Sequence, residues 1–201
     1  MNLVTDRIEQ ISQYLQPHMQ ECFLWSCEMI QTEIDCHAGE IWEELDRSIK
    51  GCLNRAASMQ EQDKKGHLKY LVFSFLRYGE YLNGPELRID ALDEGFYLDK
   101  REAAGHYRPE FLQNRYEEDL DLLHKKAREK FIRLQDYEWE EVKKEYIDFY
   151  HSVLFRMLES LAGTIMETVT DSGIPAAESL KIVFGEYMGN GTVLYERGRQ
   201  R

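Results

Sequence analysis

The densest apolar stretch of this 201-residue chain is Tyr70-Leu71-Val72-Phe73-Ser74-Phe75-Leu76, and Leu68 lies just before it. Together with Leu82, its apolar positions surround nearly the whole circumference of a helix, which is typical of a helix buried on all sides. The stretch is too short to cross a bilayer, which needs about 20 apolar residues. The sequence therefore predicts a helix over residues 68–82 at the centre of the core.

A different pattern follows the break at Asn83-Gly84-Pro85. Apolar and polar residues alternate over residues 87–91, and the turn signal Asp93-Glu94-Gly95 separates them from the apolar residues 96–98. Alternation before such a turn, with apolar residues after it, predicts a small β-hairpin near residues 86–99. For residues 192–195, a further strand is the less favoured interpretation.

Helical periodicity dominates the rest of the chain. Apolar residues at spacings of three and four predict helices in residues 1–60, two long helices between Pro109 and Gly173, and a short last helix over residues 176–188. The short connection between the long helices predicts an antiparallel pair. The predicted fold is mainly α: a single helical domain over residues 1–201, with about six helices in a bundle, a long antiparallel helical hairpin, the inserted β-hairpin at 86–99 and a disordered tail at 196–201.

The charge balance argues against two classes of partner. The chain has 25 basic and 37 acidic side chains, which gives a net charge of −12 at pH 7. Binding to nucleic acid and to anionic membranes relies on Lys and Arg, so we expect neither partner. The N-terminus carries no export signal and no Cys-x-x-Cys occurs, so we expect a cytoplasmic protein with reduced thiols. No sequence motif points to a cofactor, and none is predicted.

The loop after the predicted hairpin mixes acidic, basic and aromatic side chains. Such loops on a rigid scaffold often line small-molecule sites, although an ordinary charged connector is the simpler interpretation. The candidate ligand-binding residues are Arg88, Asp99, Arg101, His106 and Tyr107.

Aromatic and leucine residues cover an unusually wide part of the second long helix. Tyr suits interfaces because it combines an apolar ring with a polar tip. The wide apolar face indicates either a central position in the bundle or a subunit interface. The candidate interface residues are Tyr146, Phe149, Tyr150, Leu154 and Leu158.

Two Asp-x-x-His pairs form the sharpest metal hypothesis. Asp121 and His124 lie on the first long helix, Asp148 and His151 on the second, and the two pairs are mirror-related about Asp136. Side chains three residues apart share a helix face and can bind one metal. Helical geometry nevertheless points both carboxylates away from their apolar stripes. The favoured interpretation is therefore two solvated faces, with no metal site.

No catalytic motif or nucleophile stands out in the sequence, so catalytic residues stay unassigned. The leading functional hypothesis is a cytoplasmic protein-interaction module, such as an adaptor, regulator or chaperone-like binder, without catalytic activity. Its expected partner is another protein or a second copy in a homodimer. The alternative is a small-molecule-binding or metal-dependent enzyme that uses a pocket between helices or the loop at 99–108.

Overall fold

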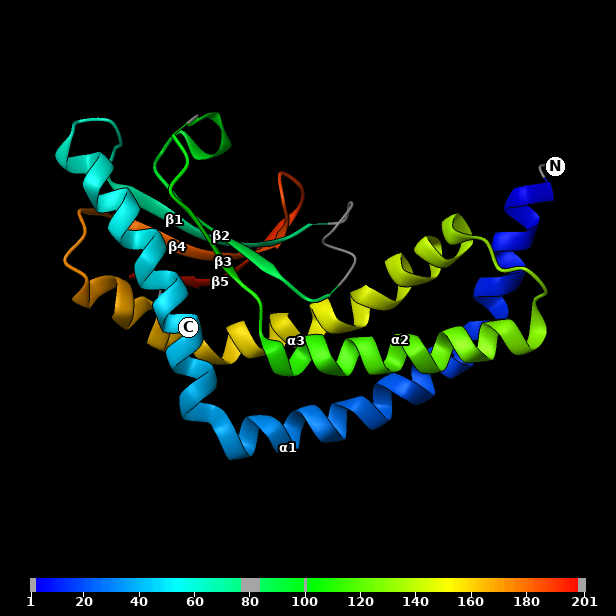
Figure 1. The fold of residues 1–201 in the computed structure, drawn as a ribbon. Coiled ribbons are helices and arrows are strands. Elements are labelled where there is room, and N and C mark those ends of the chain that lie inside the picture. Colours follow the sequence, from blue (N-terminus) through cyan, green and yellow to red (C-terminus); the bar gives the residue numbers. More distant parts are fainter. Residues whose placement is uncertain (1–2, 77–83, 100, 199–201) are drawn as a thin grey trace. The chain divides into compact units, whose positions relative to one another are not determined.

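A computed structural model describes residues 3–76, 84–99 and 101–198. It contains three α-helices and five β-strands, so the fold is α+β, and the prediction of a mainly α six-helix bundle is wrong (Figure 1). The helices are α1 (Leu3–Glu61), α2 (Glu110–Lys130) and α3 (Asp136–Asp171). The strands are β1 (Leu68–Phe75), β2 (Leu87–Leu92), β3 (Ala104–Tyr107), β4 (Ala176–Glu186) and β5 (Gly191–Glu196).

The chain divides into two compact units. Of the described residues, the helical unit comprises 3–38, 84–85 and 109–152, and the sheet unit comprises 39–76, 86–99, 101–108 and 153–198. The first parts of α1 and α3 belong to the helical unit and their second parts belong to the sheet unit. Non-helical backbone angles at His37 interrupt α1 near the boundary between its two parts. Because two helices continue from one unit into the other, the single-domain assignment stays a prediction.

The predicted central helix at 68–82 is wrong, because residues 68–75 form β1, the middle strand of the sheet. The strand order is β3-β2-β1-β4-β5, with β1 parallel to β4 and the other neighbours antiparallel. Leu71 and Phe73 are fully buried, and Val72, which points to the other face, is buried as well. A strand covered on both faces is apolar at every position, and a short apolar run cannot distinguish such a strand from a buried helix. Residues 77–82 of that prediction lie outside the described residues.

Four further assignments change with the sheet. Residues 176–186 form β4 where a last helix was predicted. In the predicted hairpin, β2 is a strand, but residues 96–98 form a 3-10 turn, and β2 pairs with β1 and β3. The less favoured strand at 192–195 is present within β5. Glu196 of the predicted tail belongs to that strand and Arg197 bonds to Leu180, while residues 199–201 lie outside the described part.

Both helical halves in the sheet unit pack on the same face of the sheet. A Cβ placed on Gly105 of β3 would lie 3.2 Å from the Ser48 carbonyl of α1, so glycine permits this close approach. On the same face, the Phe184 ring of β4 packs on Phe155 of α3, with 5.6 Å between ring centroids. The opposite face carries a smaller apolar cluster of Val72, Leu92 and Val183, covered by Tyr70, Phe96 and Tyr97.

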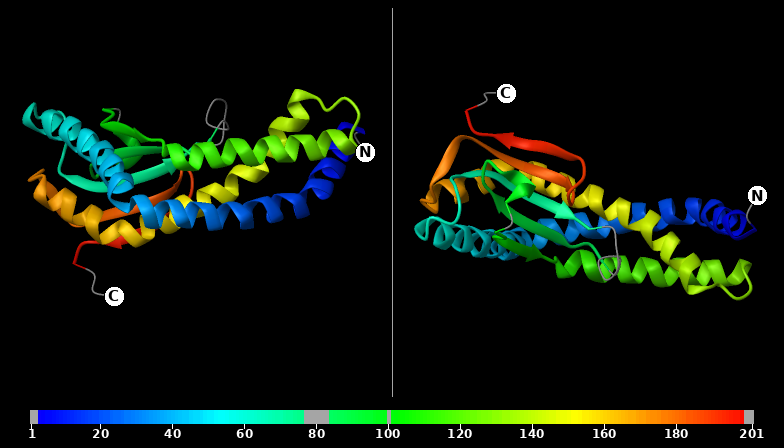
Figure 2. Two further views of the ribbon diagram at one scale, coloured as in Figure 1. Left: turned by 60° about the horizontal axis from the view of Figure 1, so that its bottom comes forward. Right: turned by 90° about the horizontal axis from the view of Figure 1, so that it is seen from above.

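The helical unit consists of the first half of α1, α2 and the first half of α3, which run side by side in the views of Figure 2. Phe131, just after α2, packs on Tyr14 of α1, and Arg115 near the start of α2 lies over Trp25 further along α1. Residue numbers therefore rise in α1 as they fall in α2, so the two helices are antiparallel.

Candidate functional site

A buried carboxylate fixes how the three helices of the helical unit align. Asp119 of α2 is 1% exposed and accepts hydrogen bonds from three hydroxyls. Ser26 of α1 donates at 2.8 Å, and Tyr146 and Tyr150 of α3 donate at 2.5 and 2.7 Å. Hydrogen bonds to a charged group contribute about 1.5–3 kcal/mol each. One side chain thus links all three helices of the unit.

Burial and the charge of Asp119 favour the protonated forms of nearby tyrosine hydroxyls and cysteine thiols. Burial, together with the hydrogen bond to Asp119 and its charge, raises the pKa of Tyr146 well above its ordinary value. Burial and Asp119 act in the same way on the pKa of Tyr150. Burial and the Asp119 charge also raise the thiol pKa values of Cys22 and Cys27 on α1. Neither cysteine is therefore poised to act as a nucleophile, which needs a lowered pKa.

A groove opens next to this cluster, between α1 and the first turns of α2. Pro109 precedes α2 and suits a helix start because its ring fixes φ near the helical value. The hollow has a volume of about 210 Å³. We call it the α1–α2 groove, and its lining residues are Met29, Ile30 and Glu33 of α1 and Phe111, Asn114 and Arg115 of α2.

Large apolar side chains remain exposed along the groove. Met29 is 45% exposed, and Trp25, one helical turn earlier, is 54% exposed. The Arg115 guanidinium lies 5.4 Å from the centre of the Trp25 ring and also pairs with Glu118. Trp and Arg are enriched among the residues that dominate protein–protein binding energies. The Asp119 network supports these residues, because Ser26 follows Trp25 and Asp119 lies one turn after Arg115.

The size of the groove distinguishes between classes of ligand. Small-molecule sites usually measure about 300–1,000 Å³, so a hollow of about 210 Å³ suits a single side chain of a partner. The sheet unit has a larger hollow of about 500 Å³. Its lining contains no Phe, Tyr, Trp or large aliphatic side chain, whereas small-molecule sites are lined mainly by such groups. The lining residues are Gly66, His67, Lys69, Asp93, Glu94, Gly95, Ala177 and Ser179.

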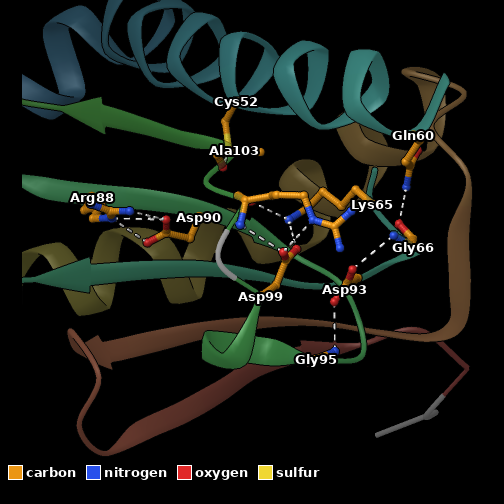
Figure 3. A network of polar contacts seen from close by, with 11 residues as sticks. Cys52, Gln60, Lys65, Gly66, Arg88, Asp90, Asp93, Gly95, Asp99 and Ala103 are labelled. Carbon is orange, nitrogen blue, oxygen red and sulfur yellow. Dashed lines mark hydrogen bonds and ion pairs between the residues drawn. The ribbon is translucent and has the colours of Figure 1, made fainter. Parts of the chain in front are cut away.

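Asp99, one of the predicted ligand-binding residues, forms a buried ion pair with Lys65 (Figure 3). The side chain of Arg101, another of these residues, is 55% exposed and contacts the same carboxylate at 3.5 Å. The Lys65 ammonium contacts the Asp99 carboxylate at 2.6 Å, and the side chains are 1% and 3% exposed. Lys65 also donates to the Arg101 carbonyl at 3.1 Å. Burial acts to raise the pKa of Asp99, but the bonds from Lys65 and the Arg101 N–H outweigh it and lower that pKa. The network anchors the loop and leaves little of Asp99 for a ligand.

Arg88 belongs to a second network, which Figure 3 shows apart from Lys65 and Asp99. Its guanidinium binds both carboxylate oxygens of Asp90, at 2.8 and 3.1 Å, and lies 4.8 Å from the centre of the Tyr187 ring. The hydrogen bond to Asp90 raises the pKa of Arg88 despite burial. His106 is the register partner of Arg88 on β3 and pairs with Glu86 at 2.8 Å.

Tyr107 points away from the other predicted ligand-binding residues. It follows His106 on β3, so it faces the helices, where it is 1% exposed. Burial and the nearby charge of Glu44 raise its pKa. The five predicted residues are therefore divided among three places and do not form one site.

Four of the five candidate interface residues lie in the interior of the chain. Tyr146, Tyr150, Leu154 and Leu158 are fully buried, and Phe149 is half-buried against Phe23. Of the two explanations for the wide apolar face, the central position accounts for these four residues. They are covered without a second subunit.

The two Asp-x-x-His pairs do not meet. His124 packs on the ring of Trp139, with 4.9 Å between centroids, while His151 pairs with Asp148 of its own helix at 3.2 Å. The helix register therefore places His124 opposite Trp139, and Asp121 is exposed. In the part of the chain that the structure describes, no group of three or more His, Cys, Asp or Glu side chains is arranged to hold a metal.

Sequence reasoning missed the residues of the α1–α2 groove, although a signal was present. Apolar residues at spacings of three and four run through Phe23, Cys27 and Ile30 in this part of α1, and Trp25 and Met29 lie off that stripe. Large apolar side chains outside a predicted buried stripe mark an exposed apolar surface. Asp119 also carried a signal, because a carboxylate spaced three residues after Tyr116 falls on an apolar stripe.

Comparisons with known proteins add no relative. No protein-family model, no curated protein and no solved structure matches this chain. In the described residues, none of the helices combines the length and apolar character that crossing a bilayer requires.

Proposed function

We propose that this chain is a protein-interaction module that binds a partner protein at the α1–α2 groove and catalyses no reaction itself. The observation that carries the proposal is the pairing of exposed Trp25 and Met29 with a hollow large enough for one side chain. Binding would remove both apolar side chains from water. Full burial of a Met side chain contributes about 1.5–3 kcal/mol.

The groove also has the rigidity that binding surfaces need. Residues on well-anchored helices lose little conformational entropy when a partner binds. Ser26 and Asp119 are tied together beneath the groove, and Arg115 is held by Trp25 and Glu118. The proposed compartment is the cytoplasm, which suits a chain whose four cysteines are free thiols.

Selection from a random peptide library tests this function. Peptides enriched on the wild-type chain are measured against Met29→Glu, which places a charge in the groove, and against Ile132→Glu. Ile132 is the matched control, because it is 84% exposed and lies outside the groove in the same unit. We expect Met29→Glu to weaken the selected peptides at least tenfold and Ile132→Glu to leave them unchanged. Equal binding to both variants, or no enriched peptide, contradicts the proposal.

A further inference from the structure

The rim of the α1–α2 groove is strongly acidic. Glu21 and Glu28 lie one helical turn before and after Trp25, and Glu33 lines the groove one turn after Met29. From α2, Glu110 lies one turn before Asn114, and Glu118 lies next to Arg115. All five carboxylates are exposed.

Cations of the chain do little to neutralise this rim. Arg115 is the single basic residue that lines the groove, and its guanidinium already contacts Trp25 and Glu118. Within the described residues, Glu21, Glu28 and Glu110 form no ion pair with a basic side chain. Glu33 lies 3.9 Å from His37, and Glu118 pairs with Arg115. A partner that enters the groove therefore meets three carboxylates that pair with no basic side chain of the described residues.

From this charge distribution we infer that the partner is a basic amphipathic helix with one apolar anchor residue. The inference rests on the proposed function and names its partner. Two antiparallel helices form a channel in which a third helix can lie with its apolar face inward. Glu21 and Glu28 are seven residues apart, which is about 10 Å along a helix. Glu21 and Glu28 flank Trp25, while Glu28 and Glu33 lie at the two ends of the α1 lining of the hollow, so Lys or Arg residues one turn on either side of the anchor lie near carboxylates.

The same charges disfavour a second copy of this chain as the occupant. The chain carries a net charge of −12, so two copies repel each other. A second copy that offered its own groove would also bring the same acidic rim against the first. Electrostatic complementarity selects a basic partner and accelerates its association, and both effects weaken with salt.

Three helical peptides of identical length and identical leucine anchor test the inference. They differ only in the residues one turn from the anchor, which are Lys, Gln or Glu. Affinity is measured by isothermal titration calorimetry at low and at high NaCl concentration. We expect the Lys peptide to bind at least tenfold more tightly than the Gln peptide at low salt and to lose most of that advantage at high salt. The Glu peptide is expected to bind most weakly.

Two charge variants, one in the rim and one distant from it, test whether the rim carboxylates attract the peptide. The variant Glu21→Lys/Glu28→Lys leaves three rim carboxylates against two new lysines and Arg115, so it is expected to abolish the preference for the Lys peptide. The variant Glu9→Lys/Glu129→Lys changes the same number of exposed carboxylates in the same unit, at least 14 residues from Trp25 or Arg115, and is expected to keep the wild-type order.

The outcomes separate the two proposals. Equal affinity for the Lys and Gln peptides, lost with Met29→Glu, overturns the basic partner and leaves the groove as the binding site. Failure of all three peptides to bind overturns the proposed function. Binding of the Lys peptide that the uncharged variant Met29→Gln does not weaken overturns both, because the peptide then recognises the acidic surface elsewhere.

Discussion

The two units of this protein bury a carboxylate in different ways. In the helical unit, Asp119 is surrounded by hydroxyls from Ser26, Tyr146 and Tyr150. In the sheet unit, Asp99 is paired with the buried ammonium of Lys65. Removing a charge from water is costly, and proteins offset that cost with hydrogen bonds or with an opposite charge.

The difference teaches how sensitive each unit is to a single change. The ion pair relies mainly on one cation, because the loss of Lys65 leaves the buried Asp99 carboxylate with the Arg101 N–H and the largely exposed Arg101 guanidinium. The hydroxyl network divides the same task among three donors, so the loss of one donor leaves two. The helical unit thus holds its buried Asp119 carboxylate with hydroxyl groups, whereas the sheet unit holds its buried Asp99 carboxylate with the Lys65 ammonium.

The largest effect is expected for Lys65→Met. Breaking a buried ion pair by removing one partner costs about 3–5 kcal/mol. Urea unfolding measures the loss, and native-state hydrogen exchange is expected to locate it in the sheet unit. The double variant Lys65→Met/Asp99→Leu is the control and is expected to recover most of the stability. A single variant as stable as the wild type contradicts this view of the pair.

Asp119→Ala leaves three buried hydroxyls without their acceptor but also removes the cost of burying a charge, so it is expected to cost somewhat less, about 2–4 kcal/mol. Tyr150→Phe removes one donor and is expected to cost about 1.5 kcal/mol, since two donors still hold the carboxylate. Urea unfolding checks both values, and hydrogen exchange is expected to place the loss in the helical unit. If Tyr150→Phe costs as much as Asp119→Ala, the network does not share its task as described.

High pH is expected to weaken the helical unit through its tyrosines. The folded pKa values of Tyr146 and Tyr150 are raised above the unfolded value of about 10. The unfolded state therefore loses protons first, so their contribution is complete below pH 10 and falls as the pH rises further. Each tyrosine contributes a slope of up to about 1.4 kcal/mol per pH unit. Urea midpoints between pH 9 and 11 are expected to fall less steeply in Tyr146→Phe/Tyr150→Phe, and identical slopes contradict this prediction.

The smallest effect on stability is expected at the groove. Trp25→Ala and Met29→Glu alter exposed side chains, and surface substitutions usually change stability by about 0.5 kcal/mol or less. Thermal unfolding measures the change. Variants that lose binding while they keep this stability separate the groove from the network beneath it. A destabilisation of several kcal/mol contradicts the assignment of these side chains as exposed binding residues.

The sequence predicts the long helices better than the sheet, for a physical reason. Spacings of three and four persist over many turns in α2 and α3, and such long periodic patterns are rarely ambiguous. The run from Leu68 to Phe75 is short and apolar on all sides, so its burial hides its period. Its parallel partner β4 lies more than 100 residues away, and no local pattern records that pairing.

The candidate site was predictable only in part. Asp119 and Trp25 stand out, one as a polar residue on an apolar stripe and the other as an apolar residue off one. Their proximity depends on the antiparallel register of α1 and α2, which pairs residues about 90 positions apart. The residues of the predicted loop site failed for the same reason, because Asp99 found its partner in Lys65, which lies before β1.

The central claim is that a basic helix binds in the α1–α2 groove, and methyl NMR of the methionines tests it most directly. Met29 reports on the groove, and Met188 of the sheet unit is an internal control because it is also exposed. We predict that the Lys peptide shifts the Met29 methyl signal saturably and leaves Met188 unchanged. An unchanged Met29 signal at saturating peptide, or equal shifts at both methionines, contradicts the account.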